Sequence, residues 1–443
     1  GAKIVAELMV KHPAAKAFVS LAENQENACG DGVTGCIILA SELMSEAGRL
    51  LERGLHPLIL VKGYQMALTS TLEVIDSRSF SSKGHLEEVA RTSLVGRLTE
   101  GALDHLAKLV SQAVNTIPDS DFERVRMAKD SQGTPANSRL INGLVLEKRL
   151  ALERMPSKLT SCKVAILSCP LEIEQSKVSS QIEISTPEQY EAFIDAEQTQ
   201  IESITAKVIS SGAQAIFCAE GIDQRVLHSL ADAGIFALGG IEKSMAEDIA
   251  KACGAMLCDH VDDISDELGE IESLHHERLE GPEGVRERLI IEVGPKAGLV
   301  TILVGGTDGI AADETIRGLF DSLRSTCLAK ETDLVILGGG SLHMAASLRV
   351  REVAESCSGR ERLSMEAFSR ALEAIPAALA TNTGTDRIDA LLELRSLQRS
   401  GNNSAGITQS GVPGTIEGVW LPSYNIEHSI SAACESACGL LRV

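Results

Sequence analysis

The sequence predicts a multidomain protein of the α and α/β classes, in which helical segments at both ends enclose an α/β insert. Its 443 residues correspond to about three domains at roughly 150 residues each. Apolar residues recur at helical spacing along residues 12–115 and again in the last hundred residues. Between these segments strands and helices alternate, which is typical of a parallel sheet covered by helices. The two helical ends could therefore form one domain, with the middle inserted into it.

The N-terminal segment is expected to be helical almost throughout. The apolar positions of residues 33–51 keep helical spacing, and Gly54 can end that helix. A second helix is expected over residues 87–114. Neither stretch shows the alternation that would indicate a strand.

The middle segment alternates between short apolar runs, typical of buried strands, and amphipathic stretches. One helix begins with a capping box, in which Thr186 is the N-cap, Pro187 is the first helical residue and Gln189 reaches back. We expect Gly212 to close this helix, one face of which carries Tyr190, Phe193, Ile201, Ile204 and Val208. The expected strands are 162–169, 181–184, 213–219, 235–238 and 298–306, and further helices are expected over 222–233 and 242–253.

Charge and composition argue against several classes of protein. The net charge of −21 and the pI of about 5.0 disfavour nucleic acid or an anionic membrane as the main partner. No apolar run approaches the roughly 18 residues that span a bilayer. The sequence does not open with a signal peptide, and its 11 cysteines contain no CxxC pair, which favours reduced thiols. These features predict a cytoplasmic location.

The stretch NACGDGVTGCIILASELM, residues 27–44, places Asp31 in a glycine loop that opens a helix. Free backbone N–H groups at a helix N-terminus bind anions, yet the carboxylate of Asp31 would repel a phosphate there. A divalent cation that bridges the carboxylate and the phosphate would remove this conflict. The alternative is a glycine turn without function, in which Asp31 caps the helix.

A second glycine loop, LGGGS at residues 337–341, lies between an apolar run and a helix, and Asp321 lies on an amphipathic helix upstream. Two glycine loops and two acids could hold a nucleotide phosphate and its metal. The chain has no GxxxxGK[ST] motif, so the metal and the helix dipoles would have to neutralise the phosphates. A dinucleotide-binding fold would need glycine where His343 stands. In the alternative without function, Asp321 forms a surface ion pair with Arg317 or Arg324.

Beyond these motifs, the chain resembles a subunit of the group II chaperonins, the family of the thermosome and the eukaryotic cytosolic chaperonin. Residues 10–64, from VKHPAAKAF to LILVKGY, match the first equatorial helices of that family. AQAIFCAEGIDQRVL and the residues that follow it match the apical domain, and VTILVGGTDGIAADETIRGLFDSL matches the return through the intermediate domain. Two stretches match the closing equatorial helices, LGGGSLHMAASLRVREVAES and AFSRALEAIPAALATNTGTDRIDALLELR.

The resemblance implies three domains. They are a helical equatorial domain, a small intermediate domain and an α/β apical domain, over residues 1–80 with 335–443, 81–144 with 299–334, and 145–298. An insert near 168–190 matches the helical protrusion that forms a built-in lid. Gly143 and the pair Gly305–Gly306 match the hinges between domains.

The resemblance also implies ATP and Mg²⁺ as cofactors, other chaperonin subunits in stacked rings as partners, and unfolded proteins as clients. Asp31 would ligate Mg²⁺, Asp321 would position and activate the attacking water, and Arg97 stands where the family usually has a lysine that senses the γ-phosphate. The residues implied around the nucleotide are Gly30, Asp31, Gly32, Val33, Thr34, Gly35, Arg97, Gly339 and Gly340. The candidates for client binding are Val226, Leu227 and Leu230, although a plain core face would explain them as well.

Departures from the family pattern leave a second function open. The family's loop is normally GDGTTT, whereas Val33 and Gly35 remove two hydroxyls here. Leu421 stands where the family usually has an acid that bonds the ribose, and the sequence begins just after the position of another family aspartate. We therefore expect slow hydrolysis of ATP. The alternative is a ring subunit with a weakened or lost ATPase that serves as a scaffold or substrate-binding wall.

Overall fold

The computed structural model describes residues 1–443 except 1, 8–9, 99, 131–132, 173–185, 267, 282–283, 295–297, 307–309 and 443. The chain divides into two compact units. The first comprises residues 1–115, 119–122 and 309–443, and the second comprises 116–118 and 123–308. The first unit is thus built from both ends of the sequence, as the helical pattern predicted. The boundaries of three domains remain a prediction.

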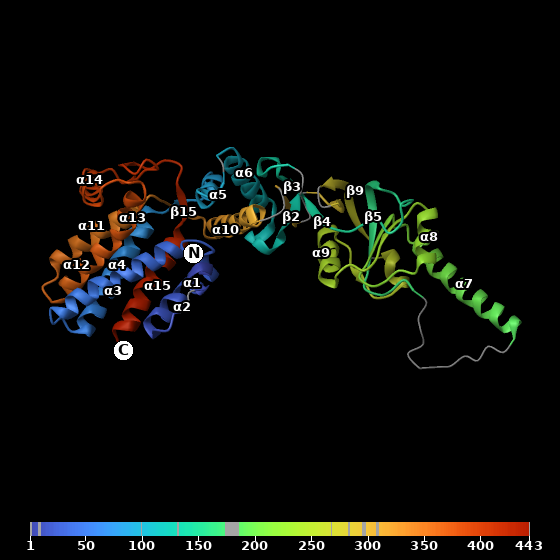
Figure 1. The fold of residues 1–443 in the computed structure, drawn as a ribbon, viewed down its shortest axis with the longest axis horizontal. Coiled ribbons are helices and arrows are strands. Elements are labelled where there is room, and N and C mark those ends of the chain that lie inside the picture. The colour runs from blue at the N-terminus through green and yellow to red at the C-terminus, as the bar shows by residue number, and fades with distance from the viewer. Residues whose placement is uncertain are drawn as a thin grey trace. The chain divides into compact units, whose positions relative to one another are not determined.

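The first unit is mainly helical (Figure 1). Its helices are α1 (Ala2–Glu7), α2 (Pro13–Cys29), α3 (Val33–Glu52), α4 (Pro57–Arg78), α5 (Leu86–Leu94), α6 (Glu100–Thr116), α10 (Ile310–Thr332), α11 (Ser341–Ser356), α12 (Glu361–Leu372), α13 (Ala374–Asn382), α14 (Arg387–Arg399) and α15 (Ser423–Leu441). Its strands are β1 (Phe80–Ser81), β12 (Leu334–Leu337), β13 (Ala405–Ile407), β14 (Pro413–Thr415) and β15 (Trp420–Pro422).

The main core of this unit lies among α3, α4, α11, α12 and α15. Leucine, isoleucine, valine and alanine fill most of it, and Tyr64 packs edge-on against Phe368. The buried hydroxyl of Tyr64 donates a hydrogen bond of 2.7 Å to the carbonyl of Leu43. A small antiparallel sheet in the order β1-β12-β15 pairs Ile336 with Leu421. This pairing brings the C-terminal part of the chain beside the second glycine loop.

The second unit is α/β. Its helices are α7 (Pro187–Ser210), α8 (Gln224–Asp232) and α9 (Lys243–Cys253). Its strands are β2 (Val125–Asp130), β3 (Arg139–Ile141), β4 (Gly143–Leu146), β5 (Lys158–Leu167), β6 (Ala215–Cys218), β7 (Phe236–Leu238), β8 (Leu257–Cys258), β9 (Gly269–Gly281), β10 (Gly284–Glu292) and β11 (Val300–Gly305). They form a three-stranded sheet, β2-β11-β3, and a seven-stranded sheet, β4-β10-β9-β5-β6-β7, with β8 also paired to β5.

Several expectations for single elements are wrong. Residues 87–114 form two helices, α5 and α6, and Gly96 between them adopts a φ of +82°. The large sheet is mixed, because β4, β9 and β10 add antiparallel strands to the predicted parallel ones. The strand predicted over 181–184 and part of the protrusion predicted near 168–190 lie outside the described residues.

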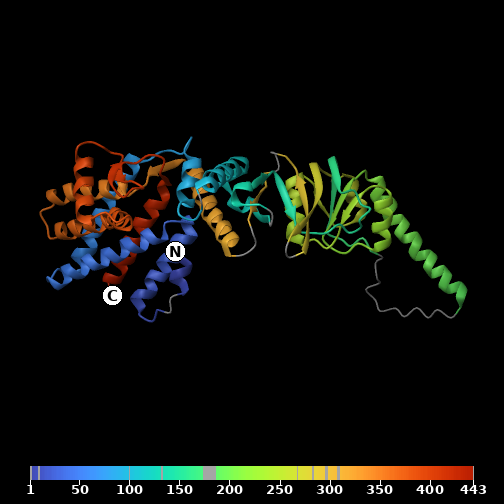
Figure 2. The ribbon, with the colours of Figure 1, turned by 45° about the horizontal axis from the view of Figure 1, so that its top comes forward.

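The first part of α7 extends beyond the sheet of its own unit in two views (Figures 1 and 2). Thr186 caps this helix as predicted, by accepting a hydrogen bond from the backbone N–H of Gln189. Ile201 and Val208 are buried, but Tyr190 and Phe193 are 57% and 39% exposed. The apolar face predicted for this helix is therefore buried at Ile201 and Val208 but exposed in the first two turns.

Two further sequence predictions concern cysteines and membranes. All 11 cysteines lie in described ranges, and none of them forms a disulfide there. Among the described helices, none combines the length and the apolar character that crossing a bilayer requires.

Candidate functional site

The loop between α2 and α3 has a backbone that requires glycine. Gly30 ends α2 and Gly32 precedes α3, with φ angles of +72° and +83°. A Cβ atom at Gly32 would come within 2.4 Å of Oδ1 of Asn425. Gly32 is the N-cap residue of α3 and provides no side-chain cap for the helix. The first N–H groups of α3 therefore keep their capacity to bind an anion.

Asp31 does not cap the helix, so the predicted capping role of the alternative is wrong. Its Oδ1 accepts a hydrogen bond of 2.7 Å from the backbone N–H of Gly32, and its Oδ2 accepts one of 3.0 Å from the hydroxyl of Ser93 on α5. These two bonds fix the direction of the carboxylate. Each oxygen of a carboxylate has a second lone-pair site, so the group can still accept a further ligand.

A buried polar network holds the loop in place from the C-terminal helix. The Nε2 atom of Gln25 donates to the carbonyl of Asp31 at 3.0 Å and to Oδ1 of Asn425 at 2.8 Å. Its Oε1 lies 2.8 Å from Nδ1 of His428. Gln25 and Asn425 are buried, so loss of either partner would leave unsatisfied polar atoms. No local sequence pattern predicts this network, because about 400 residues separate its two sides.

Asp321 on α10 faces the same loop. The Nη1 atom of Arg97 donates a hydrogen bond of 2.6 Å to Oδ2 of Asp321, and the two side chains are 29% and 18% exposed. The alternative partners are engaged elsewhere. Arg317 pairs with Glu314, and Nη2 of Arg324 donates to the carbonyl of Asn27. The expectation of a surface pair between Asp321 and one of these two arginines is wrong.

The carboxylates of Glu26, Asp31 and Asp321 lie close enough at this loop to affect one another electrostatically. Burial raises the pKa of Asp321 despite the nearby guanidinium of Arg97, and the charge of Asp31 raises it further. Burial also raises the pKa of Glu26. The negative charge of Asp321 raises this pKa further, and the charge of Asp31 does so to a smaller extent. Glu26 was not among the residues predicted from the sequence, although it lies just one helical turn before the glycine loop. The site therefore favours additional positive charge.

These groups line a cavity of about 470 Å³, which we call the charged cavity. Its lining includes Glu26, Gly30, Asp31, Gly32, Val33, Thr34, Gly35, Arg97, Glu314, Arg317 and Asp321. The side chain of Val33 packs into a small core with Ala22, while Thr34 is exposed. The structure thus places the residues predicted from the first loop together with Arg97 and Asp321, which are distant in the sequence.

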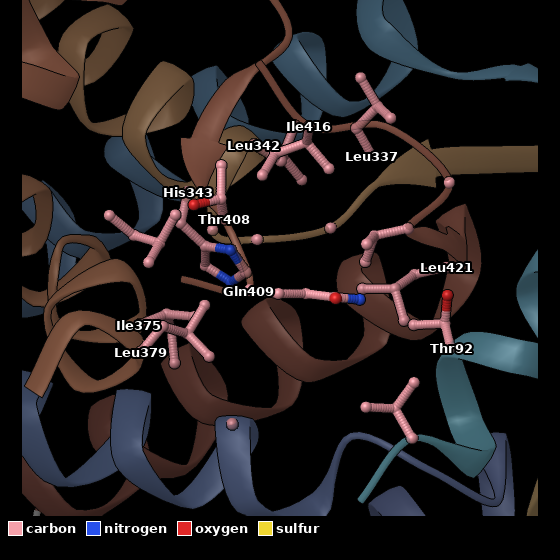
Figure 3. Close-up of a pocket in the computed structure, with 18 of the residues that line it drawn as sticks. Thr92, Leu337, Leu342, His343, Ile375, Leu379, Thr408, Gln409, Ile416 and Leu421 are labelled. Carbon is pink, nitrogen blue, oxygen red and sulfur yellow. The ribbon is translucent and has the colours of Figure 1, made fainter. Parts of the chain in front are cut away.

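A second cavity, of about 830 Å³, shares Gly32 and Gly35 with the first. We call it the apolar cavity. The glycine loop after β12 forms part of it, and Gly340 serves as the N-cap residue of α11 without a side-chain cap. Apolar side chains cover much of the remaining wall (Figure 3), among them Leu337, Leu342, Ile375, Leu379, Ile416 and Leu421. Gly339 and Gly340 both line this cavity and not the charged one.

The described side chains do not form a closed metal site. Nowhere in the described ranges do three or more His, Cys, Asp or Glu side chains gather in a way that would hold a metal ion. A cation near Asp31 would therefore take most of its ligands from a bound phosphate and from water, which is the usual way in which proteins bind Mg²⁺.

The comparisons with known proteins decide the family. The description "TCP-1/cpn60 chaperonin family" matches residues 1–443. The chain belongs to this family.

Individual relatives agree with this assignment. Thermosome subunit alpha of Archaeoglobus fulgidus is 35% identical over all of this chain and 83% of its own length. A thermosome subunit of Methanopyrus kandleri is 34% identical with the same coverage. A solved open-state monomer of a group II chaperonin from Methanococcoides burtonii matches with a TM-score of 0.66 and 29% identity, over 93% of this chain and all of that one. The predicted resemblance and the fold class are confirmed, and the chain is a chaperonin subunit.

The structure corrects the client-binding candidates of this chaperonin subunit. Val226 and Leu230 on α8 are fully buried in a core that also includes Ile201 and Val208. Leu227 is partly buried against the same core. Val226 and Leu230 therefore offer no apolar surface to a client, and the reading of them as a core face is correct.

Proposed function

We propose that this chain is an ATP-dependent protein-folding subunit of a double-ring chaperonin, with its nucleotide lying across the two cavities. One observation carries the proposal. The uncapped N-terminus of α3 opens into a cavity that also contains Asp31, Arg97 and Asp321. A helix N-terminus and a guanidinium attract phosphate, while a carboxylate beside them is useful when a cation accompanies that phosphate.

The shape of the site fits a nucleoside triphosphate. An apolar cavity of about 830 Å³ lies within the size range of ligand sites, which is about 300–1,000 Å³. At Gly35, between the two cavities, a Cβ atom would meet only Cδ1 of Ile375, at 3.9 Å. This space is therefore open, and it connects a place for the base with a place for the phosphates.

The donor set also fits Mg²⁺. Mg²⁺ is often held by one or two carboxylates together with substrate phosphates and water. Asp31 would supply the carboxylate, already oriented by Ser93 and by the N–H of Gly32. When bound, Mg²⁺ would neutralise phosphate charge and polarise the phosphoryl group.

The remaining residues of the charged cavity would have separate roles in hydrolysis. The N–H groups of Val33, Thr34 and Gly35 would bind phosphate oxygens. Asp321 would hold the attacking water and accept its proton, a role that suits a carboxyl group whose pKa is raised. Arg97 touches the Asp321 carboxylate at 2.6 Å and lines the same cavity, so it can orient Asp321 and contact the terminal phosphate.

The proposal extends to partners and location. It includes stacked rings with other chaperonin subunits, unfolded proteins as clients and a cytoplasmic location. The thermosome relatives support it, since they match over the whole chain. The exposed apolar side chains of Tyr190, Phe193 and Ile194 on α7 support a contact with unfolded protein.

Single-turnover hydrolysis of ATP by the full chain tests the assigned roles. Asp321→Ala should leave the Kd for ATP within about threefold but slow hydrolysis by about 10²–10⁴-fold, because a general base acts in the transition state. Asp104→Ala is the matched control, since Asp104 is an exposed carboxylate that pairs with Arg91. Unchanged hydrolysis in Asp321→Ala would refute the role of this residue.

A ring subunit with a weakened or lost ATPase is the second candidate. Leu421 favours it, because an apolar side chain in the apolar cavity cannot accept a hydrogen bond from a ribose hydroxyl. The same experiment separates the two functions. ATP binding without turnover in the unmodified chain would indicate the second.

A further inference from the structure

His343 is a buried polar side chain that faces the apolar cavity. It lies in the first turn of α11, three residues after the N-cap Gly340, and it is 7% exposed. Figure 3 shows its imidazole ring among the apolar side chains of the cavity. The described residues include no hydrogen-bond or ion-pair partner for this ring. A buried polar group without a partner is costly unless a ligand or water satisfies it.

The imidazole of His343 is neutral near pH 7, since burial lowers its pKa to about 4. A neutral imidazole carries one N–H donor and one acceptor nitrogen. It therefore suits an uncharged heterocycle with donor and acceptor atoms, and it adds no charge to attract a phosphate.

Gln409 supplies a second polar group to the same cavity. It lies in the turn between β13 and β14, and Figure 3 shows its carboxamide among the cavity side chains. Within the described part of the chain this carboxamide has no partner. In contrast, the hydroxyl of Thr408 donates to the carbonyl of Val412, and it pairs with Ser410.

Two other polar side chains that line the apolar cavity, Thr92 and Asn425, are already paired. The hydroxyl of Thr92 donates to the carbonyl of Glu88 and accepts from the N–H of Trp420. Oδ1 of Asn425 accepts from Gln25. His343 and Gln409 thus offer donor and acceptor atoms beside the apolar wall of this cavity, as in sites where a few polar groups select the ligand.

We propose that His343 and Gln409 recognise the polar edge of the adenine base and so determine the base specificity of the nucleotide site. This inference rests on the proposed function, because it assumes that a nucleotide occupies the two cavities. Adenine presents an amino donor and ring-nitrogen acceptors, which match the acceptor and donor atoms of a neutral imidazole and a carboxamide. The apolar wall would contact the faces of the ring.

Calorimetric titration of the full chain in Mg²⁺ with three probes tests the inference. The probes are ATP, purine riboside triphosphate, which lacks the amino group of adenine, and tripolyphosphate, which lacks base and sugar. ATP should bind about 5–10-fold more tightly than purine riboside triphosphate, as expected for one hydrogen bond. His343→Leu and Gln409→Leu should each reduce this ratio while leaving the Kd for tripolyphosphate unchanged.

Ser410→Ala is the matched control, because Ser410 lines the same cavity but pairs with Thr408. It should keep the wild-type ratio. Gln409→Leu changes an exposed turn residue, so it decides the outcome if His343→Leu unfolds the chain. An unchanged ratio in Gln409→Leu, or equal binding of ATP and purine riboside triphosphate by the wild type, would overturn the inference alone. If none of the three probes binds, the proposed function fails together with it.

Discussion

Replacing Gly35 separates the stability of the fold from the binding of nucleotide. Gly35 is the third residue of α3 and lines both cavities. A Cβ atom there would meet only Cδ1 of Ile375, at 3.9 Å, and the backbone is helical. Gly35→Ala should therefore stabilise the chain by roughly 0.5 kcal/mol, the low end of the gain from replacing glycine in a helix.

Gly35→Leu should keep the fold but obstruct the space that a triphosphate must cross. Forcing extra methylene groups into a filled site costs roughly 1–3 kcal/mol, which corresponds to about a 5- to 150-fold increase in Kd. The assay is calorimetric titration with ATP in Mg²⁺, together with the urea midpoint of each variant.

Gly48→Leu is the control for Gly35→Leu. Gly48 lies on the same helix, with no atom within 4 Å of a Cβ built there, and it lines neither cavity. This variant should bind ATP as the wild type does. The reasoning is refuted if Gly35→Leu binds normally, or if both leucine variants lose affinity equally.

Further predictions concern charge, packing and assembly. The pKa of Glu26 is raised in the folded chain, so the folded state loses stability as the pH rises from about 4.5 through that raised pKa. Glu26→Gln removes this loss and should therefore raise stability at pH 7. The gain in stability should vanish near pH 4. Urea midpoints of the wild type and the variant at pH 4 and pH 7 check this, and an equal gain at the two pH values would contradict the prediction. Leu230→Ala should cost about 2–5 kcal/mol, because this side chain is fully buried. Tyr190→Ala, at a 57% exposed position, should change stability little but weaken the suppression of client aggregation, and normal suppression would exclude this residue from the client contact. Mass photometry of the protein should show stacked rings, and monomer alone would oppose the ring assembly.

The local parts of the site were predictable from the sequence. The glycines of both loops and the apolar spacing of the following helices are short-range signals, and the structure has helices at both places. The motifs suggested that Asp321 and the two glycine loops share a phosphate site, and the family resemblance implied the role of Asp321. Its pairing with Arg97 spans 224 positions, and no local pattern predicts such a contact.

Hydrophobic periodicity failed where apolar residues have no neighbour to pack against, or where charged residues are buried. Tyr190 follows the helical pattern of α7, yet that part of the helix extends beyond its sheet. In β9 and β10, the Nε atom of the buried Arg288 donates to Glu277 at 2.7 Å. Because these two strands carry charged residues that pair with each other, their sequences lack the apolar alternation that predicts a strand.

The most direct test of the nucleotide site is the calorimetric titration of ATP with and without Mg²⁺, for the wild type and for Asp31→Ala. If Asp31 holds the cation against the phosphates, the wild type should bind ATP tightly only with Mg²⁺, and Asp31→Ala should lose this dependence together with affinity. Tight binding that ignores both Mg²⁺ and the substitution would contradict the account, because the loop at Asp31 would then be only a turn between two helices.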